Sequence, residues 1–175
     1  MTKNILASLS LIMLAALSAS AQTPAEWVKF SPPGAHFSVL LPTEPQEKKE
    51  AKQSPNGPYT GYMFASVGPT GEVYLVAWVD YEKKFDMNVQ AELEVNRDSF
   101  LKGLDAKLLS TTPIKLSAHP GIEFKAEVPG KADVVSRFYV VGRRPYALSV
   151  LTPVGRDSSA NRQRFFSSFQ LGAGE

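Results

Sequence analysis

The sequence VYLVAWV at residues 73–79 is apolar or aromatic at every position. Because successive side chains of a strand point to opposite faces, a strand here presents apolar groups on both of its sides. Such a strand belongs in the middle of a sheet that is covered on both faces. Leu75 and Trp78 then lie on opposite faces, and we expect both to be buried.

Other strands are predicted on both sides of this segment. Apolar and polar residues alternate at 36–41, and the cleanest one-sided alternation runs from Ile122 to Val128. Further strands are expected near 62–64, 107–116, 132–141 and 146–151, joined by turns at Pro120-Gly121, Pro129-Gly130 and Gly142-Arg143. The polar segment from Pro42 to Pro58 is interpreted as a long exposed excursion. As a candidate binding segment, it is extended by one residue to Tyr59.

Two helices are expected. The first spans about residues 88–102, with Asn88 or Asp86 as its N-cap and Gly103 ending it in the left-handed conformation. The second spans about 158–169 and buries Phe165, Phe166 and Phe169, with Asp157 or Ser158 as its cap. Runs of strands interrupted by one long helix predict an α+β fold, with helices packed on an antiparallel sheet.

The first 21 residues have the order of a secretory signal peptide. Lys3 precedes an apolar run from Ile5 to Leu17, and Ala19-Ser20-Ala21 follows it. Cleavage is expected between Ala21 and Gln22, leaving a linker at 22–26, one domain at 27–171 and a tail at 172–175. No second apolar segment predicts a membrane span, so we expect a soluble, exported protein, periplasmic or extracellular.

The composition narrows the class further. The chain is 43% apolar and 21% charged, which excludes a disordered or fibrous protein. It contains no cysteine, which excludes disulfides, a thiol nucleophile, thiolate metal sites and a lipid-modified cysteine after the signal. A secreted domain without disulfides indicates a bacterial envelope.

No catalytic residue and no cofactor site is predicted. The two histidines, His36 on a polar strand face and His119 in a turn before Pro120, lack neighbouring ligands, and no serine lies in a nucleophile elbow. The acidic residues after the central strand, Asp80, Glu82 and Asp86, are weak candidates for a calcium site or for glycosidase carboxylates. The alternative, which we favour, is a set of solvated charges at a strand-to-helix junction.

Charge and aromatic residues suggest where a partner binds. The six basic residues after position 136 are all arginines, but they spread along the predicted strands and form no single patch, so nucleic acid is not an expected partner. Arg143 and Arg144 share one hairpin tip, where their planar donors suit carboxylates or phosphates. Tyr59, in the polar excursion, is the aromatic residue expected to be exposed. The other aromatics of the first half form either core or a pocket for an apolar ligand.

Four segments together resemble secreted PsbP-like domains of the Mog/PsbP/DcrB type. They are FSPPGAHFSVLLP at residues 30–42, PGIE at 120–123, RFYVVGRRPY at 137–146 and FFSSFQL at 165–171. The resemblance implies an antiparallel sheet sandwiched by helices, an α/β/α arrangement, and a protein that binds or assembles with others. It carries over no catalytic set. Pro145 departs from a regular hairpin, because it lacks a backbone donor, and this implies an edge position or a bulge.

The sequence therefore favours an exported, non-enzymatic binding or assembly module of the cell envelope with an unknown partner, acting as a monomer. Two alternatives remain open at this point. One is an envelope hydrolase that uses the acids near Asp80, and the other is a carrier of a small apolar ligand. Binding residues concentrate in loops and at strand ends, so Tyr59, Arg143 and Arg144 are the partner-binding candidates.

Overall fold

The computed structural model describes residues 26–54 and 57–172. The predicted signal peptide, most of the linker and most of the C-terminal tail lie outside these residues. The elements in chain order are β1 (Val28–Phe30), β2 (Phe37–Leu41), β3 (Gln46–Ser54), β4 (Gly57–Val67), β5 (Val73–Tyr81), α1 (Val89–Gly103), β6 (Lys107–Leu116), β7 (His119–Val128), β8 (Ala132–Val141), β9 (Arg144–Pro153), α2 (Ser159–Ser167) and β10 (Gln170–Leu171).

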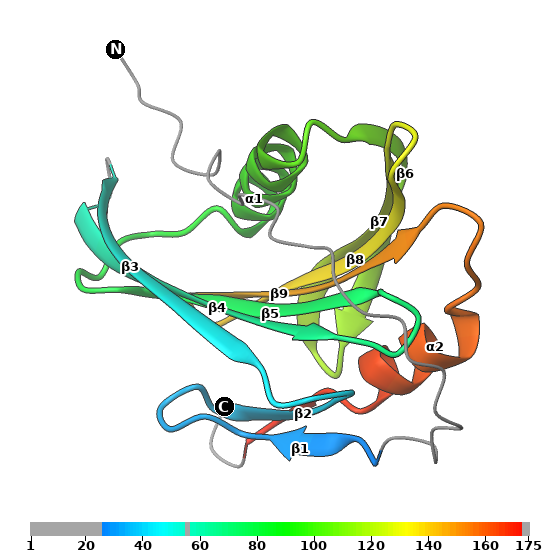
Figure 1. The fold of residues 1–175 in the computed structure, drawn as a ribbon. Coiled ribbons are helices and arrows are strands. Elements are labelled where there is room, and N and C mark those ends of the chain that lie inside the picture. The colour runs from blue at the N-terminus through cyan, green and yellow to red at the C-terminus, as the bar shows by residue number, and fades with distance from the viewer. Residues whose placement is uncertain (1–25, 55–56, 173–175) are drawn as a thin grey trace.

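The strands form two antiparallel sheets (Figure 1). The large sheet has the strand order β3-β4-β5-β9-β8-β7-β6, and the small sheet has the order β1-β2-β10. Helix α1 lies on one face of the large sheet, while the small sheet and α2 lie on the other. The segment at 73–79 is thus an interior strand, as its sequence predicts.

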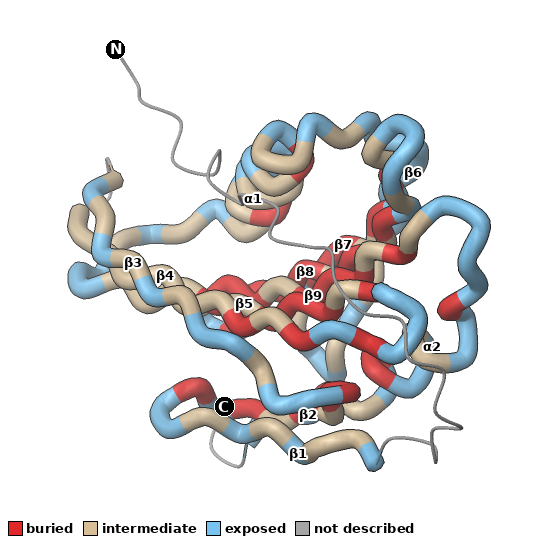
Figure 2. Tube along the Cα trace, in the orientation of Figure 1, coloured by how far each residue is buried: buried red, intermediate tan, exposed pale blue. Residues whose placement is uncertain are grey.

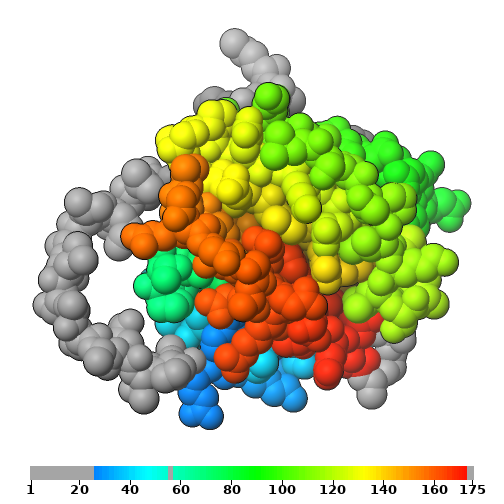
Figure 3. All heavy atoms as spheres, turned by 90° about the vertical axis from the view of Figure 1, so that its right-hand side faces the viewer, coloured from blue at the N-terminus to red at the C-terminus, as the bar shows by residue number. Residues whose placement is uncertain are grey.

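The expected α/β/α sandwich is only partly correct. One face of the large sheet carries a helix, but the opposite face is covered by the small sheet together with the short helix α2. Figure 3 shows α2 on the face toward the viewer, next to the blue residues of β1 and β2 and the yellow residues of the large sheet. The reason lies in the first segment of the family resemblance: Phe37, Val39 and Leu41 alternate with partly exposed residues and form a strand that buries one face. The fold is mainly antiparallel sheet with two helices packed on it.

We call the side of the large sheet that packs on the small sheet and α2 the closed face. On β5 it is formed by Tyr74, Val76 and Trp78, whose exposed fractions are 0%, 1% and 3%. Their partners include Phe37 of β2 and Phe165 of α2, both within ring contact. Burial of such large side chains is the main source of stability in this layer. In Figure 2 the buried segments lie mostly along the central strands of the large sheet.

We call the opposite side, where α1 packs, the open face. Helix α1 packs on β7 and β8, with Leu93 and Leu101 buried in one cluster with Phe124 and Phe138. On β5 the open face is unevenly covered: Leu75 is buried, whereas Val73, Ala77 and Val79 are only half-buried. Trp78 and Leu75 are both buried, at 3% and 8% exposed, as predicted. The cover on the two sides of β5 is nevertheless unequal.

Helix α1 begins as expected and ends differently. The Asn88 Oδ1 accepts a hydrogen bond from the Ala91 amide at 3.0 Å, which confirms the predicted N-cap. Gly103 is the last helical residue, but the left-handed residue is Asp105, with φ of 52°. The prediction for Gly103 was wrong because the turn beyond the helix is made two residues later. Asp is one of the few residues that adopt this conformation at modest cost.

The segment predicted as an exposed excursion is largely a regular edge strand. Its central part forms β3, which pairs with β4 from Gln46↔Ala65 to Ser54↔Gly57. The composition misleads here, because an edge strand with one solvated face can be polar along most of its length and still satisfy its backbone in the sheet. Tyr59 consequently lies within a strand and is half-buried.

One predicted turn is misplaced. Pro120 and Gly121 lie inside β7, and the two-residue turn is Ser117-Ala118, with Ser117 at φ of 54°. His119 likewise begins a strand. Gly121 is required for close packing, because a Cβ there would meet the Phe138 carbonyl oxygen at 2.4 Å. The glycine therefore marks a close backbone approach, which a sequence cannot distinguish from a turn.

The next two turns are where the sequence places them. The Lys131 amide donates to the Val128 carbonyl across Pro129-Gly130 at 2.9 Å, and Gly130 has the positive φ of a type II turn. Gly142-Arg143 joins β8 to β9. Pro145 lies in an interior strand without a bulge in its register, contrary to expectation. The pairing of β9 with β5 ends at Trp78↔Tyr146. Pro145 lies beyond that pair, so the backbone donor that it lacks falls where β9 has no β5 partner.

Candidate functional site

The candidate residues lie at one end of the large sheet, which we call the turn end. Asp80 is near the end of β5, Arg144 is the first residue of β9, and Tyr59 is near the start of β4. Glu82 and Asp86 follow β5 in the connection to α1. The chain order hides this neighbourhood, because β5 and β9 pair across more than 60 residues of sequence.

Arg144 and Asp80 form an ion pair. The Arg144 Nε donates to the Asp80 Oδ1 at 2.6 Å, and the Trp78 Nε1 donates to the other carboxylate oxygen at 3.3 Å. The Arg144 Nη1 also donates to the Gly34 carbonyl oxygen at 3.0 Å. The guanidinium thus ties β9 to β5 and to the loop between β1 and β2.

The electrostatic setting keeps Arg144 charged. Burial alone lowers the pKa of its guanidinium, but the Tyr146 hydroxyl and the Asp80 carboxylate outweigh that effect and hold the pKa above its ordinary value. The Tyr146 hydroxyl in turn donates to the Ala35 carbonyl oxygen at 3.0 Å. Arg144 is therefore bonded within the fold, whereas Arg143, next to it in sequence, is exposed in the turn.

The three acidic candidates do not converge. Across residues 26–54 and 57–172, no three His, Cys, Asp or Glu side chains are grouped so that they could hold a metal ion. Asp80 points toward Trp78 and Arg144, while Glu82 and Asp86 are exposed in the following loop. Each Asp80 carboxylate oxygen accepts a hydrogen bond from a protein donor, Arg144 Nε or Trp78 Nε1.

A shallow depression of about 460 Å³ lies at the turn end. It is lined by Lys84, Phe85, Asp86 and Arg143. The lining thus combines two cations, one carboxylate and one aromatic ring. Of the candidates from the sequence, Arg143 and Asp86 belong to it, and Lys84 and Phe85 were missed.

An aromatic row leads from the depression to Tyr59. The Phe85 ring lies edge-on to Tyr81 with centroids 4.9 Å apart, and Tyr81 lies 5.7 Å from Tyr59. The Tyr81 hydroxyl donates to the Glu92 Oε1 of α1 at 2.8 Å. Burial, and then this hydrogen bond, raise the pKa of Tyr81 above its ordinary value. The row is fixed to the helix, so the phenol serves as an anchor for the loop that carries Phe85.

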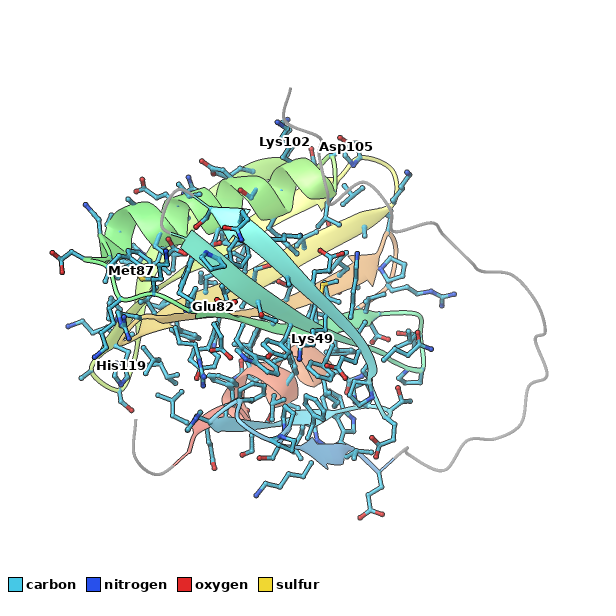
Figure 4. All side chains as sticks on the ribbon, turned by 90° about the vertical axis from the view of Figure 1, so that its left-hand side faces the viewer. Lys49, Glu82, Met87, Lys102, Asp105 and His119 are labelled. Carbon is cyan, nitrogen blue, oxygen red and sulfur yellow. The ribbon has the colours of Figure 1, made fainter. Side chains whose placement is uncertain are left out.

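The other aromatics of the first half are core residues. Tyr62 stacks on Trp78 with centroids 4.5 Å apart, and Trp27 lies edge-on to Tyr74 at 5.4 Å. Lys49, labelled in Figure 4, lies over the Tyr62 ring. These rings pack against one another and fill the space between the two sheets. Of the two interpretations that the sequence left open, core residues or a pocket for an apolar ligand, this packing supports core residues.

The opposite end of the closed face contains a buried acid that the sequence did not single out. Glu72 is 0% exposed, and its Oε2 accepts a hydrogen bond from the Thr70 amide at 3.1 Å. Its other oxygen, and the hydroxyl of Tyr74, have no hydrogen-bond partner among the described residues. A Cβ at Gly68 would lie 2.7 Å from Glu72 Oε2 and 3.0 Å from the Tyr74 ring, so a larger residue there would displace the carboxylate or the ring.

The charge state of Glu72 follows from two opposing effects. Burial raises the pKa of its carboxyl, while hydrogen bonds from its own amide and from Thr70 lower it, and the net pKa lies below the ordinary value. Burial, and then the Glu72 charge, raise the pKa of the Tyr74 hydroxyl. Such a carboxylate fixes the turn between β4 and β5. A single Glu after a Gly-Pro turn gives no sequence signal of burial.

No family model and no curated protein matches this chain. Among solved structures, it is similar to the solution structure of cyanobacterial PsbP (CyanoP) from Synechocystis, with a TM-score of 0.55. The match covers 88% of this chain and 97% of that one, at 10% sequence identity. The chain has a PsbP-like fold. This agrees with the resemblance of the four segments, and at this identity it concerns the fold alone.

A second similar structure is a crystal structure from Bacteroides thetaiotaomicron, with a TM-score of 0.46 and 16% identity. That match covers 84% of this chain and 49% of the other. None of the helices in the part of the chain that the structure describes has the length and apolar character needed to cross a membrane.

Proposed function

We propose that this PsbP-like chain is an exported, non-enzymatic binding or assembly module of the cell envelope that captures an acidic partner at the turn end. Residues 1–21 are its signal peptide, and Tyr59 and Arg143 belong to the binding end. The observation that carries the proposal is the depression beside the β8–β9 turn, which Arg143, Lys84 and Phe85 line together with Asp86.

The chemistry of this depression suits an acidic segment with an apolar side chain. Arginine presents planar donors that match a carboxylate, and lysine adds a second positive charge. Phe85 adds an aromatic contact in the same depression, and aromatic and arginine side chains are the residue types that contribute most at protein interfaces. Asp86 limits the strength of attraction, so recognition requires a partner whose acids lie over the two cations.

Arg144 has a positioning role in this proposal. Its bonds to Asp80 and Gly34 fix the first residue of β9, and thereby the turn that presents Arg143. Of the two arginines expected to bind, Arg143 contacts the partner in this proposal, and Arg144 holds the turn in place.

The experiment is capture from envelope extracts of the cells that express the protein, using the tagged chain. We expect the double variant Arg143→Glu, Lys84→Glu to lose about tenfold in capture at low salt, with the remainder less sensitive to salt. The matched control is Lys131→Glu, Arg156→Glu, which makes the same charge change with exposed residues at the far end of β8 and β9. Equal capture by both variants contradicts the proposed site.

Export has its own test. We expect the protein recovered from the envelope or the medium to begin at Gln22, which N-terminal sequencing or intact-mass measurement determines. Recovery of the unprocessed chain in the cytoplasm alone overturns export and leaves the proposed binding site to be judged by the capture experiment.

A further inference from the structure

The buried acid Glu72 and the hydroxyl of Tyr74 form a polar pair that the proposed binding site does not use. Both residues are 0% exposed. The Glu72 Oε1 and the Tyr74 hydroxyl are buried polar atoms without a hydrogen-bond partner among the described residues. Folded proteins rarely leave such atoms unpaired, because each one has given up its bonds to bulk water. Two of them, only two residues apart, indicate one shared partner.

The pair lies beneath α2 and is enclosed on several sides. Positions two apart along an extended chain point to the same side, so Glu72 and Tyr74 both lie on the closed face. The Tyr74 ring lies edge-on to Phe165 of α2 at 5.3 Å and to Trp27 at 5.4 Å. Gly68 fills the side toward the turn, because a Cβ there would meet both side chains. A partner of the two atoms is therefore small and internal.

Charges of both signs lie near the pair. Burial raises the pKa of the Tyr74 hydroxyl, the Glu72 charge raises it further, and the Arg162 guanidinium of α2 lowers it. One carboxylate and one guanidinium are thus close enough to act on the same hydroxyl. Their charges cancel in sum.

The other charged residues at this end of α2 have contacts of their own. The Arg164 guanidinium lies over the Trp27 ring at 4.8 Å, and the exposed Asp157 accepts a hydrogen bond from the Ser159 amide at 2.8 Å. Within the described ranges, no three His, Cys, Asp or Glu side chains are grouped to hold a metal ion. The setting therefore favours a neutral partner over a cation or an anion.

Water has the hydrogen-bonding groups that the pair needs. A charged carboxylate such as that of Glu72 can only accept, whereas the Tyr74 hydroxyl can donate. A water molecule between them donates one hydrogen to the Glu72 Oε1 and accepts the hydrogen of the phenol. Its second hydrogen is left for a third acceptor, and buried waters typically bond to about three protein groups.

We propose that one internal water molecule is bound between the Glu72 Oε1 and the Tyr74 hydroxyl, and that it holds the β4–β5 turn to the closed face beneath α2. The other Glu72 carboxylate oxygen already accepts from the Thr70 amide at 3.1 Å, and the Gly68 amide donates to the Glu72 carbonyl oxygen at 2.8 Å. Those bonds stay within the turn, whereas the water links the turn to a ring that packs on α2. The site is separate from the depression at Arg143.

Thermal unfolding of Tyr74→Phe is the first test, because this substitution removes one hydroxyl and little volume. Loss of a hydroxyl that bonds to water lowers stability, whereas loss of an unpaired hydroxyl leaves stability unchanged or raises it. We expect the midpoint of unfolding to fall by about 3 °C. The control is Tyr146→Phe, which removes a buried hydroxyl that donates directly to the Ala35 carbonyl oxygen and gives the scale of such a loss. A Tyr74→Phe midpoint equal to or above that of the parent chain overturns the proposal.

The double variant Glu72→Gln, Tyr74→Phe tests whether the two groups share one partner. We expect its shift in midpoint to be smaller than the sum of the two single shifts, because either substitution alone already weakens the binding of the same water. Shifts that add would mean that the two groups act independently, and would overturn the shared site.

A high-resolution crystal structure of the protein identifies the partner directly. We expect a single water at about 2.6–3.1 Å from both the Glu72 Oε1 and the Tyr74 hydroxyl oxygen, and its loss or displacement in Tyr74→Phe. A direct bond between the two side chains, a metal ion, or a group from residues outside the described ones at that position overturns the proposal, as does the absence of any bound molecule there.

Discussion

The two faces of β5 share one backbone and differ in how they are covered. On the closed face, Tyr74, Val76 and Trp78 are at most 3% exposed and pack against the small sheet and α2. On the open face Leu75 is buried at 8% exposed, but its neighbours Ala77 and Val79 are only half-buried, beside a helix that packs on other strands. The comparison teaches that a position in a central strand does not by itself bury an apolar side chain. Its burial depends on which element packs on that face of the sheet.

The largest expected effect is at the centre of the closed face. Trp78→Ala should lower the free energy of unfolding by about 3–5 kcal/mol, as truncation of a large buried aromatic residue does. Trp78 stacks on Tyr62 and Phe64 and contacts Phe37, so its loss leaves a cavity bounded by three rings. Urea denaturation measures the change. A loss below 1 kcal/mol would contradict the description of the closed face.

A matched pair on the same strand compares the faces directly. Val76→Ala should cost about 2 kcal/mol, because two methyl groups leave a fully buried site and a cavity remains. Val79→Ala should cost about 0.5 kcal/mol, since its side chain is already partly in water. The measurement is urea denaturation of both variants at one pH. Equal losses would mean that the open face is as well covered as the closed one.

The pH dependence of stability tests the buried acid of the closed face. In the folded chain the pKa of Glu72 lies below its ordinary value of 4.5. Its charged form therefore stabilises the fold above that pH, and the contribution is lost as pH falls through the folded-state value. Glu72→Gln should cost about 1–2 kcal/mol at neutral pH.

The gap between the parent chain and Glu72→Gln should narrow as the pH falls below about 4.5. Denaturation series at several pH values determine this. A gap that is constant with pH, or one that widens on acidification, would show that the carboxylate is not held in its charged form.

The smallest effect distinguishes the two adjacent arginines. Arg144→Ala should cost about 1–2 kcal/mol, less than a fully buried charge-assisted pair because the ion pair is partly exposed. Arg143→Ala should change stability by less than about 0.5 kcal/mol, as expected for an exposed turn residue. Thermal unfolding of the two variants side by side is sufficient. A larger loss of stability in Arg143→Ala than in Arg144→Ala would contradict the assignment of Arg144 as the residue that holds the turn.

Much of the fold could be predicted from local sequence. The alternation at Phe37 to Leu41, the cap at Asn88 and the turns at Pro129-Gly130 and Gly142-Arg143 are read correctly, because each depends on a few neighbouring residues. The errors arise where distant contacts decide. Gly121 was assigned to a turn, although its role is to admit the backbone of β8 and the Tyr139 ring.

The candidate site shows the same division. The sequence placed Arg143 and Arg144 together at one tip, which the turn geometry supports. It did not predict that Asp80 would bond to one of them, because nothing in the sequence states that β5 lies beside β9. Lys84 and Phe85 were missed for the same reason, since their position depends on how the loop after β5 folds over the turn end.

The sequence by itself determined the elements: an apolar interior strand at residues 73–79, a meander of four strands from β6 to β9, and two helices with their buried faces. Strand periodicity, helix caps and turn residues each depend on a few neighbouring positions, so they can be recognised from the sequence alone. Only the tertiary structure decided the order of the strands, the small sheet that replaces a helix layer, and the pairing of Arg144 with Asp80. These depend on contacts between residues far apart in the chain, whose energies appear only once the whole fold has brought them together.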